Sequence, residues 1–512
     1  MKKYIFYFIV IFSFGFTLLD NNEKQVNTYT KSYQREPVIA RNNSNGNFII
    51  VWTSNEQDGD GEGVFAQRFD KDGNKLGQEF QVNTEWKYDQ NKPAVAMNSK
   101  GNFVITWSST KPDQDLQDIY CQIYDSEGKK IGGEILVNTT TIKSQNCPDI
   151  GMDSQGNFVI VWHSWDEDGG DRGVYAQRFK YDGTKIGGQF LVNTFTKFSQ
   201  CMPTIAMNPD GKFVIAWQSW GQDDTTTTYY VDYGIYAQMF NEDGTKKGKE
   251  IHVNTTTDDD QFYPDVAIDD IGNFIITWTS WVSNTYNYSE VMAQRFDKDG
   301  NKIGGEFIVN TTLTEYQWLS SVILNNDGSF VVTWGSWKQD NSREGVYLQF
   351  FNPDGSKKNK EHRVNYYTDN YQWEPRIVSV NNDEVIVVYS SWGQDGDDYG
   401  IFMRNIKSWQ TPVKDLNKIE NNIKLEQNYP NPFNPETTIT FYLDKKENIE
   451  IIIYDINGKL IRKLIPQNIS VGKNSIKWDG KNDDMKIVPS GTYFYTIKTN
   501  NKQYSKKMIL LH

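Results

Sequence analysis

Short apolar runs separated by turn residues recur along most of the chain. The clearest copy lies between Val137 and Phe190, where β-type runs can be marked at Pro148–Met152, Asn157–Trp162, Val174–Phe179 and Gln189–Asn193. The run from Phe158 to Trp162 is apolar at every position, so a strand there needs cover on both faces. One sheet alone cannot supply that cover. The pattern therefore predicts an all-β chain whose sheets pack on one another.

The same unit repeats at a nearly constant spacing. A period of roughly 55 residues with four strands in each copy is typical of the blades of a β-propeller. The copies are marked by a Val-Asn pair at Val26, Val82, Val137, Val192, Val253, Val309 and Val364. We therefore predict a seven-bladed β-propeller over residues 22–406. Its inner strands should start near Pro37, Pro93, Pro148, Pro203, Pro264, Ser321 and Pro375.

The two ends of this repeat region complement each other. The pattern stops after Ile401–Ile406 without a fourth strand, whereas Glu23–Thr28 reads as a fourth strand with no blade of its own. We expect Gln25–Asn27 to pair with the strand around Phe402 and complete the seventh blade, because closure removes an exposed sheet edge.

The remaining segments have other patterns. Residues 1–19 combine Lys2-Lys3 with an apolar run, which indicates a signal peptide; an uncleaved membrane anchor is the alternative. No other segment is apolar for long enough to cross a bilayer, so no transmembrane segment is expected after signal removal. Residues 407–423 read as a linker. The alternating runs in residues 424–512 predict a small immunoglobulin-like β-sandwich.

The last domain carries specific motifs. The segment LEQNYPNPFNPETTITFYL at Leu425–Leu443, together with SGTYFY at Ser490–Tyr495, resembles the C-terminal sorting domain of type IX secretion. The resemblance implies export by a bacterium of the Bacteroidetes kind, the secretion machinery as a partner, and a protein that is secreted or attached to the outer cell surface. The sorting motif comprises Asn428, Tyr429, Pro430, Asn431, Pro432, Phe433, Asn434 and Pro435. A merely structural terminal domain is the alternative.

Charge and cysteine content narrow the function classes. The net charge of −13 argues against nucleic acid, whose phosphates need Lys and Arg partners. Three cysteines are not a disulfide framework. Cys121 stands where other copies have alanine and reads as a small buried residue. Cys147 and Cys201 read as equivalent positions before proline in neighbouring blades, and a bridge between them stays open.

Candidate binding residues gather in the long loops, which join second to third and fourth to first strands and share one propeller face. Tryptophan offers a large apolar area and one N–H donor, so these indoles could stack on sugars or fit a protein. The candidates are Trp86, Trp165, Trp220, Trp281, Trp318, Trp337, Trp373 and Trp392. Packing between blades is the alternative. Two insertions, at 225–231 and 283–289, could add a unique site.

The same loops are acidic. Carboxylates clustered in Asp-x-Asp-Gly runs could bind Ca²⁺, which prefers several oxygen ligands. The candidates are Asp58, Asp60, Asp166, Asp168, Asp171, Asp395, Asp397 and Asp398. A solvated acidic loop is the alternative, and no cofactor other than Ca²⁺ is expected.

Catalytic signatures are weak. The four histidines have no metal-ligand spacing, and no Gly-x-Ser-x-Gly motif is present. We therefore predict that the chain is not an enzyme but a secreted or cell-surface propeller that recognises a glycan or a protein. The alternatives are a polysaccharide-active enzyme, either a glycoside hydrolase or a lyase, and a purely structural surface protein.

Overall fold

The computed structural model describes residues 23–111, 116–223, 232–257, 259–282, 288–408, 423–443, 449–456, 458–466, 469–470, 472–498 and 503–511. All the secondary structure in these ranges is β-strand. The chain divides into two compact units, Met1–Val413 and Lys414–His512. The all-β prediction, a propeller followed by a β-sandwich, is confirmed. The predicted signal peptide, most of the predicted linker and most of the two insertions lie outside the described residues.

Seven four-stranded antiparallel sheets make up the described part of the first unit. The first strands are β2 (Gln34–Arg41), β6 (Gln90–Met97), β10 (Gln145–Met152), β14 (Gln200–Met207), β18 (Gln261–Ile268), β22 (Gln317–Leu324) and β26 (Gln372–Asn381). The second strands are β3 (Phe48–Asn55), β7 (Phe103–Thr110), β11 (Phe158–Trp165), β15 (Phe213–Trp220), β19 (Phe274–Val282), β23 (Phe330–Trp337) and β27 (Glu384–Trp392).

The outer strands complete each sheet. The third strands are β4 (Glu62–Phe69), β8 (Gln117–Tyr124), β12 (Arg172–Phe179), β16 (Tyr233–Phe240), β20 (Tyr288–Phe296), β24 (Glu344–Phe351) and β28 (Tyr399–Lys407). The fourth strands are β5 (Lys75–Gln81), β9 (Lys130–Leu136), β13 (Lys185–Leu191), β17 (Lys246–His252), β21 (Lys302–Ile308), β25 (Lys357–Arg363) and β1 (Lys24–Gln25).

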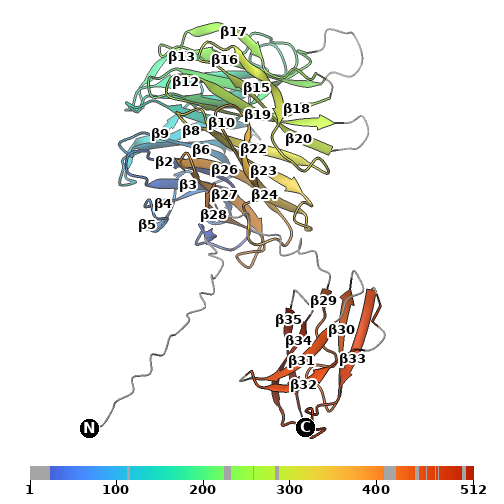
Figure 1. The fold of residues 1–512 in the computed structure, drawn as a ribbon. Coiled ribbons are helices and arrows are strands. Elements are labelled where there is room, and N and C mark those ends of the chain that lie inside the picture. The colour runs from blue at the N-terminus through green and yellow to red at the C-terminus, as the bar shows by residue number, and fades with distance from the viewer. Residues whose placement is uncertain are drawn as a thin grey trace, which may run out of the picture. The chain divides into compact units, whose positions relative to one another are not determined.

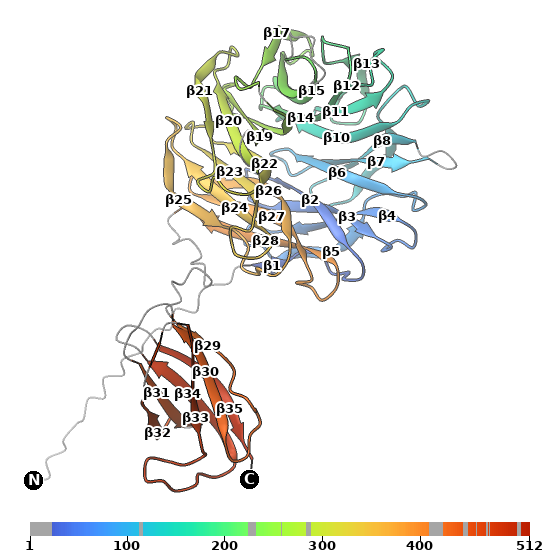
Figure 2. The same cartoon turned by 90° about the vertical axis from the view of Figure 1, so that its right-hand side faces the viewer.

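The sheets follow one another around a common centre, with the first strands innermost (Figures 1 and 2). The last sheet takes its fourth strand from the start of the chain: β1 pairs with β28, with Lys24 opposite Met403 and Gln25 opposite Phe402. Each first strand contacts the first strands of both neighbouring sheets, and β2 contacts β26, so the inner wall is continuous.

The core lies between neighbouring sheets. Val159 and Val161 of β11 pack with Ile215 and Trp217 of the next sheet, and the same arrangement recurs around the ring. Second strands are buried on both faces because each has a sheet on either side, as their apolar runs predict. Burial of each large apolar side chain contributes on the order of 1.5–3 kcal/mol.

The first strands differ from the sequence prediction in where they begin. Each starts at a glutamine, a few residues before the proline, or in β22 before Ser321, where we expected the strand to start. A β-bulge explains the difference. In β10, Asn146 pairs with His163 and Asp149 with Val161, so Cys147 and Pro148 together face one partner residue. A bulge tolerates proline because the ladder there needs no N–H donor.

The second unit has two sheets. A three-stranded sheet has the order β29 (Ile423–Leu425), β30 (Thr437–Leu443) and β33 (Gly472–Trp478). A four-stranded sheet has the order β32 (Leu460–Leu464), β31 (Glu450–Asp455), β34 (Gly491–Lys498) and β35 (Gln503–Leu510). Their inner faces share one core that includes Phe441, Ile451, Trp478 and Tyr495.

Candidate functional site: the mouth of the central channel

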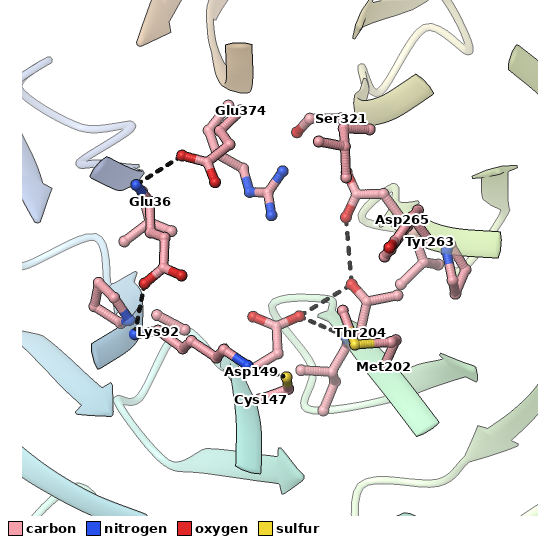
Figure 3. Close-up of a pocket in the computed structure, with 18 of the residues that line it drawn as sticks. Glu36, Lys92, Cys147, Asp149, Met202, Thr204, Tyr263, Asp265, Ser321 and Glu374 are labelled. Atoms are coloured by element: carbon pink, nitrogen blue, oxygen red, sulfur yellow. Dashed lines mark hydrogen bonds between the residues drawn. The ribbon is translucent and has the colours of Figure 1, made fainter. Parts of the chain in front are cut away.

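A cavity of about 530 Å³ lies inside the ring of first strands. All seven first strands line it (Figure 3). The volume is within the range of small-ligand pockets, roughly 300–1,000 Å³. Because the second strands end where the first strands begin, as the pairing of Ser164 with Gln145 shows, the bulged end of this channel lies on the face that carries the long loops.

Seven equivalent side chains, which we call the rim residues, stand at the bulges. They are Glu36, Lys92, Cys147, Met202, Tyr263, Leu319 and Glu374. All seven have positive φ angles, between 50° and 56°, a left-handed conformation that usually selects glycine. An L-residue there costs about 1–2 kcal/mol relative to ordinary backbone. Glycine occupies none of the seven positions, so side chains are present at the rim despite a repeated backbone cost.

The rim is chemically uneven. Glu374, Glu36 and Lys92 follow one another on one side, and Met202, Tyr263 and Leu319 form the other side. Glu374 Oε2 accepts a hydrogen bond from the backbone N–H of Glu36 at 2.9 Å, and Glu36 Oε2 accepts one from the backbone N–H of Lys92 at 2.9 Å (Figure 3). Lys92 Nζ lies 3.4 Å from Cys147 Sγ. The rim thus offers both hydrogen-bonding groups and an apolar wall.

A second layer of polar side chains lies deeper in the channel. Thr204 Oγ1 lies 3.0 Å from Asp149 Oδ2 and 3.3 Å from Asp265 Oδ1. Asp149 also accepts from the backbone N–H of Ile205, and Asp265 accepts from that of Val322, both at 2.8 Å. Each carboxylate therefore has one oxygen tied to the neighbouring first strand.

Burial changes the protonation of these acids. Burial raises the pKa of Asp149 to about 6, although the N–H of Ile205 partly offsets it. Burial also raises the pKa of Asp265, against the opposing effect of the Arg376 guanidinium. The pKa of Glu374 is raised by burial and then by the nearby Glu36 carboxylate. Perturbed carboxyl groups in a concave site are a recognised sign of function.

The tryptophans predicted from the sequence lie around this mouth in two groups. Trp86, Trp165, Trp220 and Trp392 are exposed, and the Arg172 guanidinium lies over the Trp165 ring at 4.6 Å. The other four, Trp281, Trp318, Trp337 and Trp373, are half-buried. Trp318 and Trp373 directly precede the rim residues Leu319 and Glu374 in the chain.

Each half-buried indole contacts a neighbour. Trp318 Nε1 donates to the carboxylate of Glu344, and the ring of Trp373 stacks on Tyr399 with centroids 5.5 Å apart. The rings of Trp281 and Trp337 contact Tyr316 and Tyr371, at 5.5 and 5.9 Å between centroids. These four indoles therefore have packing roles. Exposed indoles have ring contacts as well, Trp220 with Phe198 and Tyr233 and Trp392 with Tyr399, but they present more of their surface to solvent.

Several of the predicted acidic residues have a repeated structural partner. In each blade the asparagine of the Val-Asn pair accepts from a third-strand backbone N–H and donates its side-chain N–H to a carboxylate. These pairs are Asn27–Asp395, Asn83–Asp58, Asn138–Asp118, Asn193–Asp168, Asn254–Asp223, Asn310–Glu290 and Asn365–Asp340. Asp58, Asp168 and Asp395 therefore tie their loops to the sheet.

The other five candidate acids are spread over the loop surface. Asp60 and Asp397 accept backbone N–H groups, Asp166 pairs with Lys143 at 2.9 Å, and Asp171 lies 3.6 Å from Arg172. Burial raises the pKa of Asp398. Within the described ranges, no group of three or more Asp, Glu, His or Cys side chains could hold a metal ion. Calcium binding stays a prediction.

The cysteines correct one point of the sequence analysis. Cys147 precedes Pro148 and stands at the rim, but Cys201 lies one position earlier, where the neighbouring blade has Asn146. The bulge therefore separates their directions: Cys201 is buried beside Gln218, with Sγ 3.5 Å from Nε2. All three cysteines are free thiols in the structure.

The sorting motif is half anchored and half exposed. Asn428 is buried; its N–H donates to the Tyr495 hydroxyl at 2.9 Å, and its side chain donates to Thr437 Oγ1 at 2.9 Å. Phe433 is buried against Trp478, with ring centroids 5.5 Å apart. Asn431 Oδ1 accepts from the N–H of Ile509. Tyr429, Pro430, Pro432, Asn434 and Pro435 are exposed.

The rim residues were missed by the sequence analysis, although a signal was present. Each stands third in a repeated Gln-x-x-Pro segment, in which Ser320 replaces proline once. The glutamine and proline repeat, while the two residues between them change in type from blade to blade. Variation inside an otherwise regular motif could have identified these positions.

Comparison with known proteins bears on both units. Residues 427–511 match the family model of the secretion system C-terminal sorting domain. The protein is therefore exported, and it is either secreted or attached to the outer cell surface. No helix in the described residues meets the length and apolarity needed to cross a membrane. A search of curated proteins found no match.

Solved structures resemble the propeller. A Penicillium chrysogenum α-L-arabinanase with arabinobiose is 11% identical, with 63% of this chain and 94% of that chain covered and a TM-score of 0.43. The polysaccharide lyase Uly1 is 10% identical, with 71% and 88% covered and a TM-score of 0.45. The β-propeller domain of the Pyrococcus furiosus Trilobed protease is 11% identical, with 76% and 98% covered and a TM-score of 0.41.

These comparisons correct the prediction that the chain is not an enzyme. The similar structures include glycoside hydrolases and a polysaccharide lyase, all with TM-scores below 0.5. At 10–17% identity the likeness concerns the fold alone. The match of residues 427–511 to the sorting-domain model shows export and does not bear on what the propeller does.

Proposed function

We propose that this exported protein binds a glycan at the mouth of its central channel. One observation carries the proposal: seven equivalent rim positions hold side chains in a left-handed backbone conformation, and none of them is glycine. Strained backbone tends to persist where it positions groups for function. A structural role alone would be met by glycine at lower conformational cost.

The composition of the mouth favours a sugar over other small ligands. A sugar presents hydroxyl groups at its edge and an apolar C–H face. Glu36, Glu374 and the backbone around them can hydrogen-bond hydroxyls, while the Tyr263 ring, which is 38% exposed, can stack on an apolar face. The four exposed tryptophans extend this aromatic character across the surrounding face.

Binding can be tested directly on a glycan array, followed by titration calorimetry of any glycan retained. Tyr263→Ala should weaken binding by roughly tenfold, the value of about one good aromatic contact. Tyr181→Ala is the matched control, since Tyr181 is 65% exposed in the turn between the third and fourth strands, at the opposite end of the propeller. Equal effects of both substitutions would contradict the proposal.

Glycan cleavage is the second candidate, and the Glu36–Glu374 pair favours it. A carboxyl group with a raised pKa can act as a general acid, and a second carboxylate beside it can act as a base or nucleophile. Glu374 has the raised pKa, and its Oε2 contacts the backbone N–H of Glu36. Release of reducing ends from a bound glycan, abolished by Glu374→Gln with binding retained, would support cleavage. Binding without release would leave a recognition protein.

A further inference from the structure

We infer that the channel recognises the uncharged terminal sugar of a glycan chain rather than a stretch within it. This inference rests on the proposed function of the same site. It follows from three features of the channel: the continuity of its wall, the depth between its two polar layers and the balance of charged groups that line it.

The continuous wall of first strands allows a ligand from the loop face to enter the channel in only one direction. Each first strand contacts both neighbouring first strands, and β1 closes the last sheet against β28. The cavity is lined from every blade, as Figure 3 shows for the labelled residues. A ligand must therefore enter along the propeller axis. A chain lying across the mouth could lower a middle unit to the rim only by folding back on itself, whereas a chain end can enter directly.

The depth of the site suits one sugar unit. Cys147 at the rim and Asp149 in the deeper layer are two residues apart on β10, which corresponds to at most about 6 Å, because the bulge at Cys147–Pro148 shortens the strand there. That spacing is comparable to the thickness of a single sugar ring. The terminal unit would pass Tyr263 at the rim and place its hydroxyls against Asp149, Thr204 and Asp265.

The deeper layer can accept hydroxyl groups. Asp265 accepts one backbone N–H, at Oδ2, whereas Asp149 accepts two, from Ile205 at Oδ2 and from Ile150 at Oδ1. The Thr204 hydroxyl lies between the two carboxylates. Adjacent carboxylates with a hydroxyl between them provide acceptors and one donor at neighbouring points, which matches adjacent hydroxyls on one sugar ring. The figure shows these three side chains directed toward the cavity from neighbouring strands (Figure 3).

The lining selects against acidic sugars. Four carboxyl groups line the cavity, at Glu36, Asp149, Asp265 and Glu374, against two cations, at Lys92 and Arg376. A uronate or sulfate would meet this excess of acids in a site of low dielectric, where like-charge contact is costly. An uncharged terminal sugar avoids that penalty.

The experiment uses the full chain and a panel of neutral linear homoglycans, namely arabinan, xylan, mannan and β-1,4-glucan. Each is prepared at three chain lengths, and the number of propellers bound per chain is measured by titration calorimetry. Terminal recognition predicts the same number of propellers per chain at every length. A number that rises in proportion to chain length would overturn the inference and leave the proposed function intact. Failure of every glycan to bind would overturn both.

Two variants and one charged probe sharpen the result. Thr204→Val and Asp149→Asn should each weaken binding at least tenfold, whereas Asp182→Asn, in an exposed turn at the far end, should not. Thermal melting followed by circular dichroism separates loss of fold from loss of binding. Valine has nearly the shape of threonine, so Thr204→Val still tests the site if Asp149→Asn proves unstable. Polygalacturonate should not bind, and binding as tight as that of a neutral glycan would refute the charge argument.

Discussion

The side chain of Asn27 donates a hydrogen bond to Asp395 at 2.9 Å across 368 residues of chain. Asn27 follows β1, the strand that completes the last sheet, and its Oδ1 accepts from the backbone N–H of Ile401 in β28 at 2.8 Å. The same bonds form within every other blade. The hydrogen bonds of this asparagine, which connect strands within each of the other blades, therefore also connect the two ends of the propeller and close the ring.

Replacing Asn27 should open this closure. In Asn27→Ala the buried N–H of Ile401 loses its acceptor, which costs about 1–3 kcal/mol of unfolding free energy. We expect a lower midpoint in chemical denaturation and faster amide exchange in β28. Asn45→Ala is the control, since Asn45 lies in an exposed turn and caps only Asn47. An unchanged exchange rate in β28 would show that the bond does not hold the ring closed.

The carboxylate that accepts a hydrogen bond from the asparagine of the Val-Asn pair should serve equally well from the loop or from the third strand. In five blades this carboxylate belongs to an aspartate of the loop between the second and third strands. In these blades the third strand has a glycine beside the aspartate, as Gly400 lies beside Asp395, because a Cβ there would lie closer than 3.0 Å to the aspartate side chain. In the second blade Asp118 of the third strand, at the position of Gly400, makes the bond instead. We predict that Asp395→Gly destabilises the protein by about 1–3 kcal/mol and that adding Gly400→Asp restores much of this loss. A double-mutant cycle measures the recovery; strict additivity would contradict the interpretation.

The strain at the rim should be measurable. Tyr263 has φ of 50°, so Tyr263→Gly should be more stable than Tyr263→Ala by about 1 kcal/mol, because only alanine retains a Cβ in the left-handed conformation. Both variants lack the ring and should bind glycan equally weakly. Equilibrium urea unfolding compares the two. A more stable alanine variant would mean that the rim backbone is not strained.

A buried acid should make stability depend on pH. Burial raises the pKa of Glu344 to about 8, against the hydrogen bond from Trp318. Because the folded state holds this proton more tightly than the unfolded state, the contribution to stability is present at acidic pH and is lost as pH rises through about 8. The slope can reach about 1.4 kcal/mol per pH unit. Urea unfolding at pH 5–8 should show a flatter profile in Glu344→Gln and an unchanged one in the exposed-turn variant Glu127→Gln. A steeper profile in the glutamine variant would refute this assignment.

The sorting domain should depend on its anchored residue. Phe433 is buried against Trp478, and truncating a buried Phe typically costs about 3–5 kcal/mol. Phe433→Ala should therefore unfold this unit in part and reduce the amount of protein outside the cell, measured by immunoblotting of culture supernatant and intact cells. Tyr429 is 82% exposed, so Tyr429→Ala should leave the fold of the domain intact. This variant tests whether the export machinery recognises the exposed residues of the motif directly.

Repeats, strand order and the sorting domain could be read from the sequence because they depend on local patterns. Apolar second strands such as Phe158–Trp162, the recurring Val-Asn pairs and the Asp-Gly turns each report on contacts within one blade. The acidic loops show the limit of this approach. Asp58, Asp168 and Asp395 suggested a cation site, yet each bonds an asparagine that lies beside it only after folding.

The candidate site was decided by the tertiary structure alone. Glu36 and Glu374 are 338 residues apart in the chain, and their contact exists because ring closure brings the first and last inner strands together. The seven rim residues are of six residue types. The Gln-x-x-Pro repeat marks their positions in the chain, but it does not reveal that a bulge directs all seven side chains into one channel. The chain by itself determined which strands form and which end carries the secretion signal. Only the closure of the sheets around an axis decided which side chains meet, because that contact depends on positions that are distant in sequence.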